Sequence, residues 1–261
     1  MRLEEKILFS LGRCNNKGLS KNMNEPKIRL ISKELQIRLN ENKVLISIFK
    51  DNIKKIKNFI NGEYLFLLVD SKGILLSEYT GKKGQQLDKS SIKMGVSFSE
   101  ESSGTNAISV AMDSKEEVYL TPEQHYCDFL QQWYCFALPL YFNKEIIGYL
   151  DVSTISFKLK QELMGIALLL RDNIIKDLKV HKKLVSSQQK NFKRKVADKQ
   201  IKIVKFLAQG LTEQEVAQEL SCSKSTIKYH KKKLFAYLDV GCTREAIIKA
   251  LQQGLIKLAE I

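Results

Sequence analysis

Apolar residues repeat with two different periods along the chain. Over residues 1–61 they recur at helical spacing, first at Ile7, Leu8 and Leu11 and again from Ile28 to Ile60. From Tyr64 onward they gather in short runs typical of strands, at residues 64–69, 74–76, 117–120, 134–141 and 146–152. Polar or Gly-bearing turns at 70–73 and 142–145 pair the flanking runs as hairpins. The pattern predicts an α+β fold, an antiparallel sheet with flanking helices.

A much longer helix is predicted from Phe157. Its apolar stripe advances by three or four residues at a time, through Leu163, Ala167, Leu170, Ile174, Leu178, His181 and Val185. Such a stripe forms either a dimer seam or a lid on the sheet. The polar, basic stretch from Ser186 to Lys195 then predicts a hinge.

The C-terminal part contains two short helices joined by a polar turn. Thr212 and Glu215 have the spacing of a capping box, and Ser223 is placed to cap the second helix. That second helix is rich in lysine, at positions 224, 228, 231, 232 and 233, and has no acidic residue before Asp239. A helix-turn-helix with a basic second helix is typical of proteins that read the major groove of DNA.

The overall charge agrees with a polyanion as partner. The 261 residues carry 43 Lys and Arg against 29 Asp and Glu, a formal net charge of +14. An anionic membrane surface would also suit this charge, but no apolar run reaches the ~18–20 residues that span a bilayer. The acidic N-terminus is unlike a signal peptide, and the 5 cysteines show no CxxC spacing. We therefore expect a cytoplasmic protein without a membrane segment, disulfide framework or metal site.

Residues 196–256 resemble the LuxR/FixJ-type DNA-binding domain. The matching stretches are 206–212, 215–217, 226–228, 245–246 and 254–256, together with Ser223, His230, Leu238 and Val240. The resemblance implies an all-α domain of four helices whose third helix enters the major groove. It also implies that Lys228, Tyr229 and Lys232 face the bases and that Lys224, Ser225 and Thr226 lie at the helix start, where phosphate contacts are common.

Three positions depart from that family pattern. Gln200 stands where Glu is usual, and Thr243-Arg244 inverts the usual order. Lys231 replaces a Val on the stripe of Ile227, Leu234 and Leu238, which should be buried. Its stem can cover the stripe while its ammonium group reaches water, so we expect Lys231→Val to raise the melting temperature.

The middle of the chain resembles the GAF sensory domain of activators of the acetoin-catabolism regulator type. The shared features are Gly95 to Glu100, Gly104-Thr105-Asn106-Ala107-Ile108, His125-Tyr126-Cys127, Trp133-Tyr134-Cys135 and Gly148-Tyr149-Leu150-Asp151, with Phe98 in place of a Trp. Those activators also have an ATPase domain, but this chain has no GxxxxGK[ST] loop. Nor does it show a phosphoacceptor receiver domain.

An effector pocket is predicted within this GAF-like region, because such pockets combine an apolar wall with a few polar groups. The candidate residues are Glu100, Thr105, Asn106, His125, Trp133 and Cys135. Structural roles compete with this interpretation: Gly104 to Asn106 can cap a helix, Trp133 can be core, and a single His is commonly a hydrogen-bonded structural group. Cys127 and Cys135 are either a redox pair or simply buried thiols. We predict no catalytic residue, metal ligand or cofactor.

Four segments follow from these patterns: an N-terminal helical segment (1–40), a GAF-like sensor (41–157), a linker or dimerisation helix with a basic hinge (158–195) and a DNA-binding domain (196–261). We expect a single-component, sequence-specific transcriptional regulator and not an enzyme. Its expected partners are promoter or operator DNA, a small-molecule effector, a second copy of the chain and RNA polymerase. The alternatives are a GAF-fold thiol enzyme that reduces methionine sulfoxide and a constitutive DNA-binding protein whose GAF domain only dimerises.

Overall fold

The computed structural model describes residues 2–81 and 92–261, apart from the side chains at 185–195 and 260. The chain divides into two compact units, Met1–Lys179 and Val180–Ile261. They are called the N-terminal domain and the C-terminal domain below, and each is described separately.

A five-stranded antiparallel sheet is the centre of the N-terminal domain, within the described residues. Its strands are β1 Leu65–Asp70, β2 Leu75–Thr80, β3 Val118–Leu120, β4 Trp133–Phe142 and β5 Glu145–Ile155, in the order β2-β1-β5-β4-β3. The two predicted hairpins, β1–β2 and β4–β5, are both present and join through β1 and β5. The α+β fold class is confirmed, and β5 lies at the middle of the sheet.

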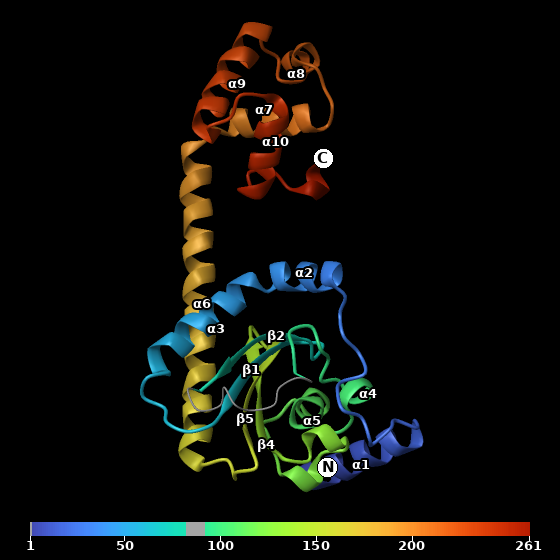
Figure 1. The fold of residues 1–261 in the computed structure, drawn as a ribbon. Coiled ribbons are helices and arrows are strands. Elements are labelled where there is room, and N and C mark those ends of the chain that lie inside the picture. Colours follow the sequence, from blue (N-terminus) through green and yellow to red (C-terminus); the bar gives the residue numbers. More distant parts are fainter. Residues whose placement is uncertain (1, 82–91) are drawn as a thin grey trace. The chain divides into compact units, whose positions relative to one another are not determined.

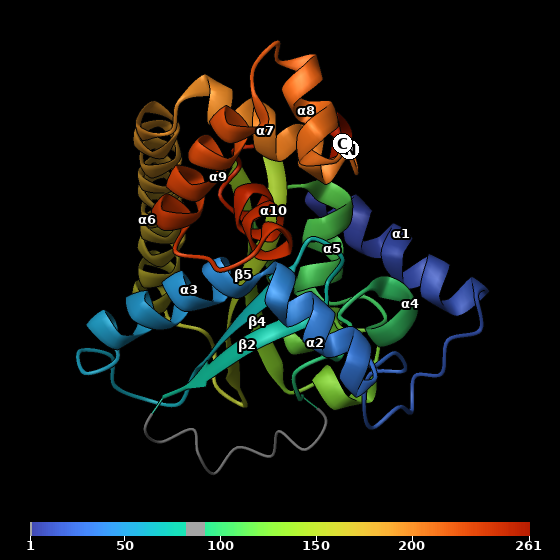
Figure 2. The same ribbon diagram turned by 90° about the horizontal axis from the view of Figure 1, so that it is seen from above.

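Both faces of the sheet are covered, which explains why β1 is apolar at almost every position. Alternate side chains of a strand point to opposite faces, so Leu65, Leu67 and Val69 enter one core and Phe66 and Leu68 enter the other. Helices α1 Leu3–Asn16 and α5 Ala107–Ser114 cover the first face, with the short α4 Glu100–Ser103 beside them (Figure 1). Helix α3 Lys43–Ile56 and the first half of α6 Gln161–Lys195 cover the second. Figure 2 shows the strands between these two groups of helices.

The apolar stripe of α6 is a lid on the sheet. Leu163, Ala167, Leu170 and Ile174 are buried in the same core as the inner residues of β4 and β5. Leu178 is also buried and His181 is exposed, while the side chain of Val185 lies outside the described ones. Helix α6 continues through the stretch from Ser186 to Lys195, where a hinge was expected. That stretch has no Gly or Pro, and its Gln, Lys and Arg residues favour a helix.

The N-terminal helices differ from the expected pattern in two ways. The stretch from Ile28 to Ile60 is not one helix, because Arg29 pairs with Val96 in an isolated β-bridge and Asn42 separates α2 Ser32–Glu41 from α3. Residues 1–40 are not a separate segment either, since α1 packs on α5 and buries Ile7 in the main core. Periodicity detects a helix face but not which neighbour that face will meet.

The C-terminal domain is all-helical, as predicted. It contains α7 Asp198–Ala208, α8 Glu213–Glu219, α9 Lys224–Leu238 and α10 Thr243–Gln252, followed by the short 3-10 helix η4 Leu258–Glu260. Two apolar clusters hold it together. One contains Val204, Leu234, Leu238, Ala246 and Ala250, and the other contains Ile203, Val216 and Ile227.

Candidate functional site

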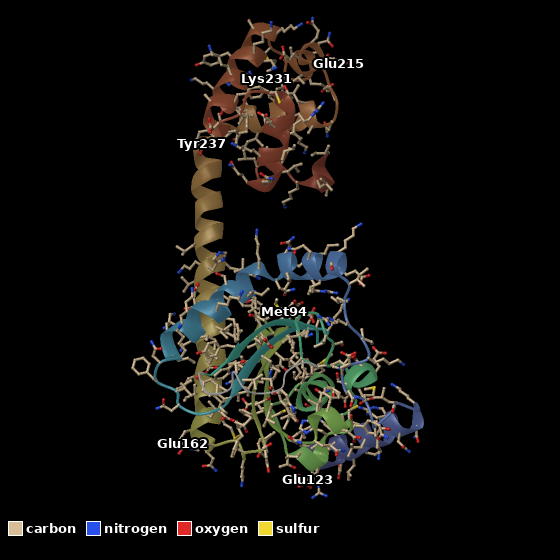
Figure 3. All side chains as sticks on the ribbon, viewed as in Figure 1. Met94, Glu123, Glu162, Glu215, Lys231 and Tyr237 are labelled. Atoms are coloured by element: carbon tan, nitrogen blue, oxygen red, sulfur yellow. The ribbon has the colours of Figure 1, made fainter. Side chains whose placement is uncertain are left out.

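The helix-turn-helix is fixed locally by its caps. The hydroxyl of Thr212 accepts from the backbone N–H of Glu215 at 3.3 Å, and the Glu215 carboxylate accepts from the N–H of Thr212 at 2.7 Å. At the start of α9 the Ser223 hydroxyl accepts from the N–H of Thr226 at 3.2 Å. Each cap satisfies backbone donors that a helix start leaves free. Figure 3 labels Glu215 on α8 and Lys231 on α9 (Figure 3).

The predicted DNA-contacting residues are on the side of α9 away from the core. Lys224, Ser225, Lys228, Tyr229 and Lys232 are exposed, whereas Thr226 is half-buried. The opposite side of the helix buries Ile227, Leu234 and Leu238. Lys233 places its ammonium group 4.7 Å from the centre of the Tyr229 ring, a cation–π distance. The structure therefore presents four cationic side chains and an aromatic ring to solvent on one helix.

Lys231 lies between these two sides of α9. Its side chain is 24% exposed, and its ammonium group forms an ion pair with Glu213 at the start of α8. Hydrogen bonding from Lys231 lowers the pKa of Glu213, more than burial raises it. Lys231 therefore links α9 to α8, a contact that the sequence did not indicate.

In the N-terminal domain a cavity of about 10 Å³ lies on the α5 side of the sheet. Its apolar walls are Leu67, Phe98, Ala107, Ile108 and Leu130, and its polar groups come from Asn106, His125, Trp133, Cys135, Asp151 and Ser153. Four of the six predicted effector residues thus share one cavity. Room of this size holds about one water-sized group.

The strand register explains why Asp151 and Ser153 enter this cavity. Asp151 lies opposite Leu67 of β1 and Ala137 of β4, and Ser153 lies opposite Cys135. Residues two apart on a strand share a face, so both side chains point to the α5 side. The Ser153 hydroxyl donates to Oδ1 of Asp151, and Oδ2 has no hydrogen-bond partner within the described protein. Complete burial raises the pKa of Asp151 to about 7, although the hydrogen bond from Ser153 opposes that rise.

His125 lines the same cavity from a segment that covers part of its wall. This cover segment, residues 121–130, consists of two short 3-10 helices, η2 Pro122–Gln124 and η3 Asp128–Leu130. Nδ1 of His125 lies 3.0 Å from the carbonyl oxygen of Thr121, while Nε2 is buried without a partner among the described groups. Burial lowers the pKa of His125 to about 4. The imidazole is therefore neutral at pH 7.

Asn106 has a structural role. Its amide donates to the carbonyls of Phe98 and Gly104, both at 2.9 Å, and its Oδ1 accepts from the N–H of Ser109 at 2.9 Å. Asn106 thereby caps α5, and both hydrogens of its side-chain amide are donated to backbone carbonyls. Trp133 is 4% exposed and is part of the core as well as of the cavity wall.

Glu100 and Thr105 lie outside the cavity. Glu100 accepts hydrogen bonds from Arg13, at 2.6 Å in the shortest contact, and from Ser10 at 2.7 Å. The Thr105 hydroxyl lies 2.9 Å from that of Ser10. Burial would raise the pKa of Glu100, but the hydrogen bonds from Arg13 and Ser10 outweigh it and the pKa is lowered. These two residues attach α1 to the region around α4.

The two cysteines considered as a redox pair lie in different places. Cys135 lines the cavity, whereas Cys127 packs with Cys14 and Tyr126 in a separate cluster. Burial raises the pKa of Cys127 to about 12 and raises that of Cys135 well above its usual value. Buried thiols of this kind are poor nucleophiles. Among the described residues, no group of three or more His, Cys, Asp or Glu side chains is placed to hold a metal ion.

Asp151 and Ser153 were not among the predicted site residues. The available signal was a single carboxylate inside the apolar run 146–152, which is predicted to be a strand. An acidic residue is rarely fully buried unless it is paired. Its position should have marked Asp151 as a candidate.

Comparison with known proteins identifies the C-terminal domain. Residues 195–250 match the family described as bacterial regulatory proteins, luxR family. The C-terminal domain is a LuxR-type DNA-binding domain. Helices α8 and α9 are its helix-turn-helix.

Two curated relatives are transcriptional regulators. The chain is 31% identical over 111 residues to the HTH-type transcriptional regulator AlkS of Alcanivorax borkumensis, covering 38% of this chain and 13% of that protein. It is 28% identical over 135 residues to a signal-transduction and transcriptional-control protein of Clostridium beijerinckii, covering 50% of this chain and 21% of that protein. The chain therefore spans only a small part of the length of each, and the matched relatives are regulators.

A solved structure resembles the N-terminal fold. The Escherichia coli DhaR(N)–DhaL complex superposes with a TM-score of 0.63 and 19% sequence identity, over 70% of this chain and 63% of the other. A match of that extent includes most of the N-terminal domain, and at this identity it shows the fold alone. The predicted α+β fold class, an antiparallel sheet with flanking helices, is confirmed. None of the described helices is both long and apolar enough to cross a membrane.

Proposed function

We propose that this chain is a single-component transcriptional regulator in which the GAF-like domain binds a small effector and the LuxR-type domain binds a specific operator. One observation carries the proposal. A DNA reader is joined, in one chain, to a domain with a small cavity lined by His125 and Asp151, whose buried Nε2 and Oδ2 atoms have no hydrogen-bond partner among the described residues. Natural proteins leave few such atoms unpaired, and those that remain call for an explanation such as a ligand.

Within the reader, α9 would lie in the major groove. Lys228, Tyr229 and Lys232 are exposed within about one turn of each other and would face the bases. Lys224, Ser225 and Thr226 are at the N-terminus of the helix, where backbone N–H groups and the helix dipole favour phosphate. The hydroxyls of Ser225 and Thr226 already lie within hydrogen-bond distance of Ser223.

Occupation of the cavity would be transmitted through the elements that border it. Strand β5, which carries Asp151, leads into α6 after residues 156–160. The cover segment is attached to the chain that follows α1: Tyr126 donates to the Leu19 carbonyl at 2.8 Å, and the Asp128 N–H donates to the Lys21 carbonyl at 2.9 Å. An effector acts only through its different affinity for two arrangements of these elements.

The proposed assembly is a homodimer in the cytoplasm that acts with RNA polymerase. The stripe from Leu163 to Ile174 is occupied by the sheet, so pairing through α6 would use its other face, where Leu169 is 66% exposed.

A GAF-fold thiol enzyme is disfavoured by the raised pKa values of Cys127 and Cys135. No observation favours a GAF-like domain that only dimerises.

The test begins with selection of a binding site for the full chain from random duplex DNA. Lys228→Ala should then relax base preference at one or two positions of the site, whereas Lys224→Ala should weaken binding to all sequences alike. Lys202→Ala removes the same charge from an exposed position on α7 and is the matched control. An unchanged base preference for every α9 variant would overturn the assigned reader. An operator affinity that no small molecule alters, across a metabolite library, would overturn the sensor.

A further inference from the structure

The chemistry of the cavity narrows the class of effector. We propose that it binds the protonated amino group of a small primary amine, with Asp151 as counter-ion and His125 Nε2 as a second hydrogen-bond acceptor. This inference rests on the proposed sensor function and specifies its ligand.

The first argument is that both unpartnered atoms accept hydrogen bonds. The carbonyl oxygen of Thr121 only accepts, so the hydrogen of the neutral His125 ring must be on the Nδ1 that faces it. Nε2 is then left with a lone pair toward the cavity. Oδ1 of Asp151 already accepts from Ser153, and Oδ2 presents the remaining lone pairs. When Asp151 is ionised, the occupant therefore has to be a donor toward both residues.

The second argument is size. The cavity of about 10 Å³ admits one water-sized group. An ammonium group of that size has three N–H donors and no acceptor, so it can satisfy both residues at once. A single hydroxyl has one hydrogen and would leave one of the two acceptors without a donor.

The third argument is charge. None of the ion pairs between described residues includes Asp151, although a buried carboxylate is strongly destabilised without a cation beside it. The aromatic rings of Phe98 and Trp133 also line the cavity, and the face of such a ring attracts a cation. A protonated amine supplies the missing positive charge next to the Asp151 carboxylate, and the two aromatic rings favour a cation there.

The carbon chain of the amine requires more room than the head group, and the cover segment is the element that can provide it. Residues 121–130 contribute His125 and Leu130 to the cavity wall and contain two 3-10 helices instead of a packed α-helix. Glu123, labelled in Figure 3, is exposed on η2, which shows that this part of the segment faces solvent. Opening here would admit the alkyl part beside Leu130 and Trp133.

Trp133 supplies a direct readout, because it is the single tryptophan of the chain and lines the cavity. Full-length protein is titrated with methylammonium, ethylammonium and propylammonium chloride, and in parallel with methanol, ethanol, propanol and equal concentrations of sodium chloride. We expect a saturable change in Trp133 fluorescence with the amines alone. Asp151→Asn should weaken that response more than tenfold. Asp51→Asn, the same change at an exposed position of α3, should leave it unaltered.

The pH dependence of the parent protein tests the proposal without any variant. With a pKa of about 7, the ionised fraction of Asp151 rises about tenfold between pH 6 and 8, and amine affinity should rise with it. His125 and Cys135 also line the cavity, and both keep their charge over this range, because burial lowers the pKa of His125 to about 4 and raises the pKa of Cys135 well above its usual value. A neutral ligand that accepts a hydrogen bond from the protonated carboxyl would show the opposite trend.

Three results would overturn the amine assignment: alcohols that act as strongly as the amines, an amine response that survives in Asp151→Asn, or no fluorescence change with any amine, as expected for a cavity that holds only a structural water. Operator affinity is measured in the same samples. Amine binding without a change in DNA affinity would contradict the sensor function while supporting the ligand class. A neutral compound that changes both would contradict the ligand class and support the sensor function.

Discussion

Two carboxyl groups of the N-terminal domain, Glu100 and Asp151, are shielded from water but differ in their hydrogen-bond partners. Glu100 is held by Arg13 and Ser10, and these hydrogen bonds keep the pKa of Glu100 low. Asp151 receives one hydroxyl and no cation within the described protein, and its burial raises the pKa to about 7. The fold therefore uses Glu100 to join α1 to α4, while it pays a stability cost to keep Asp151. Retention of a costly carboxylate beside a cavity is the pattern of a binding site.

The largest effect should come from removing the charge of Asp151. Because its folded pKa is raised above the unfolded value of about 3.9, the domain loses stability as pH rises through the folded pKa near 7. The side chain of Asn at this position does not titrate. The free energy of unfolding of Asp151→Asn, relative to that of the parent protein, should therefore rise by about 3 kcal/mol between pH 5 and pH 8. Urea unfolding followed by Trp133 fluorescence measures this for the N-terminal domain alone.

His125 is the internal control of that experiment. Its depressed pKa makes stability rise with pH between about 4 and 6.5, equally in both proteins, so the difference between them removes this effect. A difference in stability that is constant from pH 5 to pH 8 would show that Asp151 has an ordinary pKa. The contrast with Glu100 would then disappear.

Glu100→Gln should act in the opposite direction. It leaves the Arg13 guanidinium without its anionic partner and should destabilise the N-terminal domain by about 1–2 kcal/mol, a value reduced because Arg13 is 40% exposed. The same urea unfolding at pH 7 provides the measurement. Asp113→Asn removes a weaker contact to Arg13, at 3.7 Å, and should change stability by less than about 0.5 kcal/mol. Equal effects of the two variants would show that Glu100 has no special role.

The smallest effect extends the comparison to a paired carboxylate in the C-terminal domain. Lys231→Val leaves Glu213 half-buried without its partner, so it should lower stability by about 1 kcal/mol, in contrast to the increase expected from sequence. Differential scanning calorimetry of the full chain gives the melting temperature of this domain. Lys232→Val, at the neighbouring exposed position, is the control and should have little effect. A higher melting temperature for Lys231→Val would show that the ion pair with Glu213 contributes nothing.

Elements whose causes are local follow directly from the amino-acid sequence. The caps at Thr212 and Ser223, the lysine-rich side of α9 and the two hairpins each depend on residues a few positions apart, and all are present in the structure. The exposed side of α9 follows from helical periodicity, because a residue's direction on a helix is fixed by its spacing from the buried ones. The predicted DNA-contacting residues could therefore be placed without tertiary information.

The contacts between residues far apart in the chain come from tertiary packing. It divided the six predicted effector residues, bringing His125, Trp133 and Cys135 to a cavity, giving Asn106 the cap of α5, and assigning Glu100 and Thr105 to the attachment of α1. It also added Asp151 from the central strand, turned the stripe of α6 into a lid and paired Lys231 with Glu213. Each of these contacts depends on strand order and helix packing over many residues of separation. The spacing of residues along the chain does not indicate how far apart they lie in the folded protein.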